Sequence, residues 1–290
     1  MRRLRSSLEQ HPPFTPLVLK AWIPLGLTSI VLAVLAIVLD STPVLLASFV
    51  AGSIAGPVAF LVDFQYRTGL AALPPRSALL SGALVGGPLA VGVSALLESG
   101  FAPIGMNWST VLIGPIEEFA KLLVPVALLG AHRVSQRAAL LCAICSAASF
   151  QVIENLLTAV GTLHMQGAGA STAVLASRGL IGPFTHCMWT TTIALAWFGT
   201  RDYGMLRDVR VHRLLGWFVL VSLLHSLWDV STGTHPQLLA LALAGTAFVG
   251  TLLAHHAATA PTARRWARVR DSAADHERVL RELQERSLRP

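Results

Sequence analysis

The chain has few charged residues, and they are unevenly spread. Asp, Glu, Lys and Arg make up 13% of its 290 residues, while 53% are hydrophobic. A soluble globular domain has about 25% charged residues. Long stretches of this sequence carry almost none, and the charges gather in short segments between them. This pattern excludes an ordinary soluble domain and predicts an all-α membrane protein built as a bundle of spanning helices.

Cysteine is also scarce, which excludes a disulfide-stabilised fold. Three cysteines cannot build a disulfide framework. Cys142 and Cys145 form a C-x-x-C pair, but the pair lies in an apolar run, and no second pair completes a zinc site. We interpret both residues as small side chains at a helix interface. The net charge of +7 is typical of basic cytoplasmic loops, so no nucleic-acid partner is expected.

Eight apolar segments have the length of about 20 residues that a spanning helix needs. They lie at residues 20–39, 43–62, 77–97, 109–130, 137–160, 180–200, 212–231 and 236–256. The first is too long for the core of a signal peptide, which predicts a retained span. With alternating helices, all of the 22 Lys and Arg residues except Lys121 and Arg178 fall on one side. Cytoplasmic loops are rich in Lys and Arg, so we predict a multi-pass cell-membrane protein with both termini in the cytoplasm.

The chain divides into two parts of different composition. Residues 1–260 form the predicted transmembrane domain, and residues 261–290 form a basic, polar tail. Apolar residues recur in the tail at steps of three and four, which predicts an amphipathic helix on the anionic leaflet of the bilayer or against another chain. A loosely structured solubilising tail is the alternative. The sequence leaves the oligomeric state open.

Ionisable residues occur inside four consecutive predicted spans, the fourth to the seventh. They are Glu117, Glu118, Lys121, Glu154, His186, His225 and Asp229. A charged group in hydrocarbon costs about 2.5–3.5 kcal/mol, so such residues are usually paired or functional. Counting along alternating helices puts Glu117, Glu154, His186 and His225 at one depth, about 9–12 Å below the outer surface. We therefore predict one shared polar cavity in the outer half of the membrane.

Helical spacing relates these side chains further. Lys121 lies one turn from Glu117 and can neutralise one of the two adjacent carboxylates. Asp229 lies one turn from His225 and can orient its ring. Together the histidines and carboxylates supply the ligands and the acid or base that metal-assisted hydrolysis requires.

Three strings in these spans resemble the signature motifs of the PrsW family of intramembrane metalloproteases. They are Glu117-Glu118-x-x-Lys121, then Phe150-x-x-x-Glu154 followed by Asn155, then His225-x-x-x-Asp229. The stretch from Arg178 to Trp189 is also similar to a segment of that family, and the resemblance covers residues 109–231. CAAX prenyl endopeptidases and bacteriocin-processing membrane proteins form a related group, whose second motif usually ends in His. Glu154 at that position favours the PrsW branch.

The resemblance implies hydrolysis of a membrane-embedded protein, with anti-sigma factors as the best-known substrates. We expect a single-span substrate that is cut near the extracytoplasmic side. Glu117 is the expected general base, and Glu154, His186 and His225 are the expected ligands of a zinc ion. A glutamate mechanism without a metal is the alternative. Asp229 would orient His225 or help to bind the oxyanion.

Three matters stay open at this level. Arg178 would hold the substrate at the mouth of the cavity or bind a lipid phosphate. The same ionisable residues could instead serve as the relay of a proton-coupled transporter. A catalytically inactive scaffold that binds single-span partners is the third possible function.

Overall fold

The structure, a computed structural model, describes residues 16–68, 76–101, 106–131, 136–178, 185–198, 211–231 and 240–250. These residues fold into helices, and no strand occurs among them. The predicted all-α class is therefore confirmed for the described part. Both termini and the predicted tail at 261–290 lie outside the described residues. The cytoplasmic location of the termini and the amphipathic tail stay predictions.

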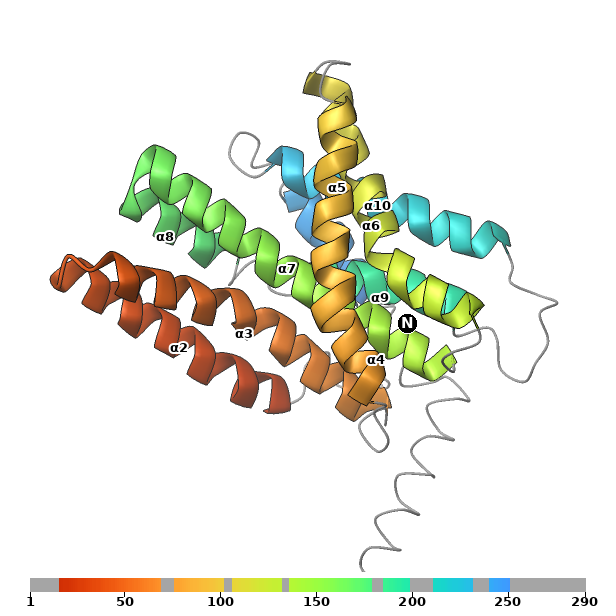
Figure 1. Ribbon diagram of the computed structural model, residues 1–290, viewed down its shortest axis with the longest axis horizontal. Coiled ribbons are helices and arrows are strands. Elements are labelled where there is room, and N and C mark those ends of the chain that lie inside the picture. The colour runs from red at the N-terminus through yellow and green to blue at the C-terminus, as the bar shows by residue number, and fades with distance from the viewer. Residues whose placement is uncertain are drawn as a thin grey trace, which may run out of the picture.

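The helices pack around α7, which lies near the middle of the molecule (Figure 1). Their bounds are α2 Pro16–Val38, α3 Thr42–Thr68, α4 Arg76–Leu80, α5 Gly87–Phe101, α6 Met106–Gly130, α7 Gln136–Gln166, α8 Ala168–Ala176, α9 Thr185–Phe198 and α10 Val211–Ser231. A π-helical turn, Ser81–Gly86, joins α4 to α5. A further short helix covers Ala240–Gly250. In Figure 1, α2 and α3 lie side by side, and α5 crosses α7.

Five of these helices are long and apolar enough to cross a membrane. They are Leu19–Val38, Thr42–Phe64, Arg76–Phe101, Ala138–Gln166 and Leu214–Ser231. They match the first, second, third, fifth and seventh predicted spans. The fourth predicted span corresponds to α6, which carries three charged residues, and the sixth to α9, which has 14 residues. The multi-pass membrane class is thus supported, while the count of eight spans stays a prediction.

The fifth predicted span is longer than expected and ends in a hairpin. We predicted its end at residue 160, but α7 continues to Gln166. Gly167 then adopts φ = 86°, a left-handed conformation that glycine tolerates without a steric penalty. The chain reverses there, and α8 returns along α7, where the Ser171 hydroxyl donates to the Ala159 carbonyl at 2.5 Å. This hairpin brings the end of α8 back toward the middle of α7.

Small residues allow the closest helix contacts. A Cβ at Gly82 would overlap the carbonyl oxygen of Cys142 and approach Cys145. A Cβ at Gly114, on α6, would overlap the carbonyl oxygen of Ser222 on α10. Both cysteines are free and buried, which agrees with the predicted packing role of the C-x-x-C pair.

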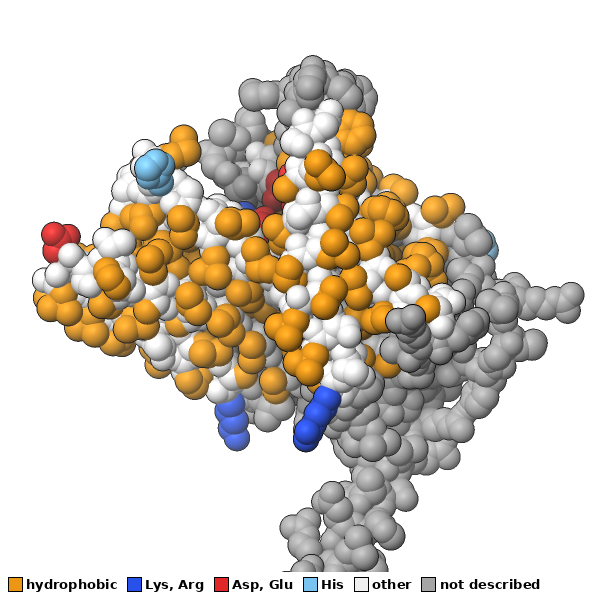
Figure 2. Space-filling view, viewed as in Figure 1, with side chains coloured by type: hydrophobic (Ala, Val, Ile, Leu, Met, Phe, Trp, Pro, Cys, Tyr) orange, Lys and Arg blue, Asp and Glu red, His pale blue; other side chains and the backbone are white. Residues whose placement is uncertain are grey.

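The described residues present a largely apolar surface, as a bilayer solvent requires. Outward side chains of α2, such as Leu27 and Val34, are exposed. Figure 2 shows hydrophobic side chains over most of the described face, with basic side chains at its lower edge and acidic ones in a hollow beside α5. Inside, Leu141, Ile144 and Trp189 belong to an apolar core built largely from α7, α9 and α10. The polar cluster described next borders on this core.

Candidate active site

The predicted ionisable residues meet in one buried cluster. Three lie on one turn of α6, one on α7, one on α9 and two on α10. They are Glu117, Glu118, Lys121, Glu154, His186, His225 and Asp229, and ion-pair contacts link all of them. The structure therefore brings together every residue that the sequence analysis assigned to the site.

Lys121 is the central cation of the cluster. Its Nζ donates to Glu118 Oε1 at 2.9 Å, to Glu117 Oε2 at 3.2 Å and to His186 Nδ1 at 3.0 Å. The ammonium also lies 4.1 Å from the centre of the Phe150 ring, within cation–π range. Three acceptors and an aromatic face thus replace the water shell that a buried ammonium loses.

Glu118 is held by three donors and has no contact with solvent. Lys121 and His225 Nδ1 both donate to its Oε1, the latter at 3.0 Å. Thr190 Oγ1 donates to its Oε2 at 2.7 Å. A carboxylate held in this way is suited to orient His225 and poorly suited to accept a further proton. Thr190 was missed by the sequence analysis, because a threonine on an apolar helix carries no distinguishing pattern.

Glu117 differs from its neighbour because part of its side chain is accessible. Its side chain is 8% exposed, against 0% for Glu118. Its Oε2 lies 3.2 Å from His225 Nε2. Of the two adjacent carboxylates, Glu117 is the one that a water molecule can reach.

His225 has one nitrogen in use and one available. Its Nδ1 donates to Glu118, so in the neutral ring Nε2 carries the lone pair. That Nε2 is buried and makes no hydrogen bond within the described part of the chain. Glu117 Oε2 and Asp229 Oδ2 lie 3.2 Å and 3.4 Å from it. The atom is thus placed to bind a metal ion or, when protonated, to donate to an oxyanion.

His186 lies between Lys121 and Glu154. Lys121 contacts its Nδ1, and Glu154 Oε2 lies 2.9 Å from its Nε2. The rings of His225 and Trp189 lie against it, with centroids at 4.7 Å and 5.5 Å. His186 is in the first turn of α9, which begins at Thr185, whereas we expected it about six residues into a longer span.

Arg178 forms a pair that the sequence analysis did not find. At the end of the α7–α8 hairpin its Nε donates to Asn155 Oδ1 at 2.9 Å, and its Nη2 forms a short ion pair with Glu154 Oε1. The guanidinium is largely buried by these contacts. We expected a contact with substrate or lipid phosphate, and the structure shows a contact within the protein. In the sequence, Arg178 was marked by its place as the lone basic residue on its predicted side and by the family-like stretch from Arg178 to Trp189, and neither signal identified Glu154 as its partner.

Glu98 is a further acidic residue near the site. It lies on α5, just past the predicted end of the third span, and its Oε1 is buried without a hydrogen-bond partner in the described residues. Its charge interacts with those of Glu117 and Glu154. The position at a predicted span end gave no reason to connect it with the later helices.

A metal ion fits part of this donor set. Glu117, His186 and His225 each place one ligand atom within 4.8 Å of the others, and all three are buried. One carboxylate and two imidazoles suit zinc, and the unpartnered His225 Nε2 is the kind of atom that a metal would occupy. The predicted set had Glu154 in place of Glu117. Glu154 contacts His186 but is also paired with Arg178.

The arrangement defines a class of protein. Apolar helices enclose paired carboxylates, two histidines and a lysine, and water has limited access to one of the carboxylates. These are the groups that a hydrolase with its active site within the membrane requires.

The comparison with known families gives the particular group. A family profile described as PrsW family intramembrane metalloprotease matches residues 74–265, well over half of the chain. The chain belongs to the PrsW family. The match includes every residue of the cluster and extends beyond the predicted 109–231 to include α5 with Glu98. No curated protein and no solved structure matches the chain.

Proposed function

We propose that the protein is an intramembrane peptidase in which Glu117 acts as the general base. The observation that carries this proposal is the contrast between the two adjacent carboxylates. Glu118 has three donors and no exposure, while Glu117 is partly accessible beside His225. Glu117 would take a proton from a water molecule that attacks the scissile carbonyl, and would then return it to the leaving amine.

Charge that develops on the substrate also finds partners in the cluster. In the mechanism without a metal, His225, oriented by Glu118, would donate from its protonated Nε2 to the oxyanion. Asp229, 3.4 Å from the same nitrogen, would stabilise the protonated ring. Lys121 contacts both neighbouring carboxylates and offsets one of their two negative charges, which lowers the cost of burying them in hydrocarbon.

We further propose zinc as the metal of this site. When bound, zinc supplies Lewis-acid activation of a water molecule or carbonyl. His186 and His225 belong both to the predicted ligand set and to the set that the structure brings together. Glu117 and Glu154 are the two carboxylates available as the third ligand. With Glu117 as the general base, Glu154, which contacts His186, is the proposed third ligand.

The proposed substrate is a membrane protein with a single span, and an anti-sigma factor is the substrate that family resemblance favours. We propose cleavage in the extracytoplasmic half of that span. In the predicted orientation, His186 at the start of α9 and His225 near the end of α10 support this side. The side chains of Glu154 and Asp229, 21% and 15% exposed, mark where water would enter.

The test uses the purified full chain and a single-span substrate in vesicles. Glu117→Gln and His225→Ala are expected to abolish cleavage, since each removes a group that acts on the reacting atoms. His164→Ala is the matched control, because His164 is exposed near the end of α7, about 15 Å along that helix from Glu154. Full cleavage by both site variants would refute the proposed mechanism. Mass spectrometry of the fragments would show on which side of the membrane the cut lies.

A further inference from the structure

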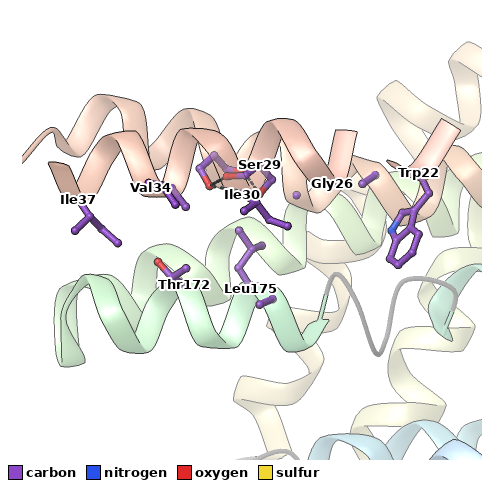
Figure 3. Close-up of a pocket in the computed structure, with 13 residues that line it drawn as sticks. Trp22, Gly26, Ser29, Ile30, Val34, Ile37, Thr172 and Leu175 are labelled. Atoms are coloured by element: carbon purple, nitrogen blue, oxygen red, sulfur yellow. Dashed lines mark hydrogen bonds between the residues drawn. The ribbon is translucent and has the colours of Figure 1, made fainter. Parts of the chain in front are cut away.

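A groove lies between α2 and α8 on the membrane-facing surface. It has a volume of about 210 Å³ and includes Trp22, Ser29 and Ile37 of α2 and Leu175 of α8. Figure 3 shows Trp22 and Ile37 at opposite ends, with Thr172 and Leu175 of α8 facing α2 across the gap. The 15 residue steps from Trp22 to Ile37 correspond to about 22 Å along a helix. The groove is thus long and narrow.

The walls of the groove offer no available hydrogen-bonding group among its hydroxyls. Ser29 Oγ donates to the Ser48 carbonyl at 2.9 Å, and Ser48 Oγ donates to the Ser29 carbonyl at 2.8 Å. Thr172 Oγ1 donates to the Ala168 carbonyl at 2.8 Å within its own helix. The remaining lining residues are apolar or glycine, apart from the indole nitrogen of Trp22 at one end. A polar ligand would therefore lose hydrogen bonds to water and gain none here.

The size of the groove decides between apolar occupants. A transmembrane helix about 10 Å wide and 22 Å long occupies roughly 1,700 Å³, far more than the groove provides. An apolar cavity of about 150 Å³ binds benzene, so 210 Å³ accommodates about eight carbons of a thin chain. Exposed side chains such as Ile30 and Val34 show that the groove opens to the bilayer side of α2.

We propose that this groove binds one acyl chain of a membrane phospholipid. A segment of about eight carbons of that chain lies beside α2, within the groove between Trp22 and Ile37 that separates α2 from α8. Bound there, it packs against the face of α8 that carries Thr172 and Ala176. Arg178 follows α8 by two residues, and it pairs with Glu154. The acyl chain thus helps to keep Arg178 paired with Glu154. Its effect on catalysis rests on the proposed peptidase function, whereas the binding of the lipid does not.

Photo-crosslinking tests the binding directly. The full chain is placed in phosphatidylcholine vesicles that contain a small fraction of phosphatidylcholine with a diazirine in one acyl chain. After illumination, the lipid adducts are mapped by mass spectrometry. We expect adducts to concentrate on residues 22–37 and 172–176. Equal labelling of all bilayer-facing helices would overturn the proposal.

Two glycines provide a matched pair of variants. A Cβ at Gly26 in the groove, or at Gly92 on α5, meets no atom within 4 Å, so both positions accept a side chain. Gly26→Leu fills the groove and is expected to lower the adducts on α8 severalfold, with Gly26→Ala intermediate. Gly92→Leu should leave them unchanged. Unchanged adducts in Gly26→Leu would refute the proposed site. Loss of the lipid adducts when a single-span peptide is added would also refute it, because a helix would then occupy the groove.

Peptidase activity is measured in the same vesicles as a separate readout. Gly26→Leu is expected to change the cleavage rate, because it alters the packing of α8. The acyl chain length of the vesicle lipid should change the cleavage rate of the wild type. Wild-type protein that binds lipid in the groove but cleaves no substrate would refute the peptidase function and leave the lipid site intact. Wild-type protein that cleaves substrate but gives no lipid adducts in the groove would refute the lipid site and leave the peptidase function intact.

Discussion

Removal of the Arg178 guanidinium is expected to lower catalysis without unfolding the protein. In Arg178→Gln, Glu154 loses its cation and Asn155 loses a donor at 2.9 Å. Removing one partner of a fully buried ion pair costs about 3–5 kcal/mol. The Arg178 and Glu154 side chains are 11% and 21% exposed, so water compensates part of the loss and about 1–3 kcal/mol remains. Loss of a partner that orients a site residue typically lowers activity about 10–100-fold.

The assay separates a positioning role from a substrate-binding role. Cleavage of a single-span substrate is measured as kcat and KM, and stability is measured by thermal unfolding in the same detergent. If Arg178 positions Glu154, kcat falls and KM changes little. Arg76→Gln is the control, because Arg76 is exposed at the start of α4, and it should leave both values unchanged.

A double-mutant cycle supplies the decisive result. Because Arg178 acts through Glu154, adding Arg178→Gln to Glu154→Gln should cost little more activity than Glu154→Gln alone. The interaction energy between them should exceed about 1 kcal/mol. Additive effects, or an effect of Arg178→Gln confined to KM, would refute the positioning role and favour a direct contact between Arg178 and the substrate.

Three other predictions concern packing, metal and the tail. Gly114→Leu should prevent stable expression, because its side chain would overlap α10. Gly130→Leu, at an open position, should express normally. Equal yields of the two variants would contradict the close α6–α10 contact. Purified wild type should contain about one zinc per chain by elemental analysis, reduced in His225→Ala and retained in His164→Ala. Metal-free wild type that still cleaves substrate would establish the glutamate mechanism instead. Deletion of residues 264–290 should leave cleavage unchanged, since the ligand candidates lie elsewhere, and loss of activity in a correctly inserted truncation would assign the tail a role.

The local relations within the site were predictable because helical spacing determines them. Lys121 contacts Glu117 and Glu118 on the turn before it, and His225 lies 3.4 Å from Asp229 one turn later. The meeting of four helices followed from the cost of burying charge in hydrocarbon, which favours grouping such residues. Composition and spacing therefore predicted the membership of the cluster.

Contacts between distant segments could not be predicted in the same way. Arg178 reaches Glu154 because Gly167 reverses the chain, and a single glycine in a small-residue stretch does not specify that reversal. Thr190 reaches Glu118 through the relative rotation of α6 and α9. Such rotations depend on side-chain packing over the whole interface, which one sequence does not reveal. Whether Glu117 or Glu154 lies closest to the two histidines depends on the same packing, so the sequence did not determine the third metal ligand.

The pairing of Arg178 with Glu154 also bears on how the protein enters the bilayer during synthesis. Each unpaired charge raises the cost of insertion by about 2.5–3.5 kcal/mol. The α7–α8 hairpin carries both members of its ion pair and can therefore insert as a nearly neutral unit. The α6 helix carries two carboxylates but one lysine, so one negative charge lacks a cation on that helix. The contact with His225 forms only after α10 has been made, and His225 follows Glu118 by 107 residues. Membrane integration of α6 is thus completed by a helix that the ribosome has not yet made when α6 leaves it.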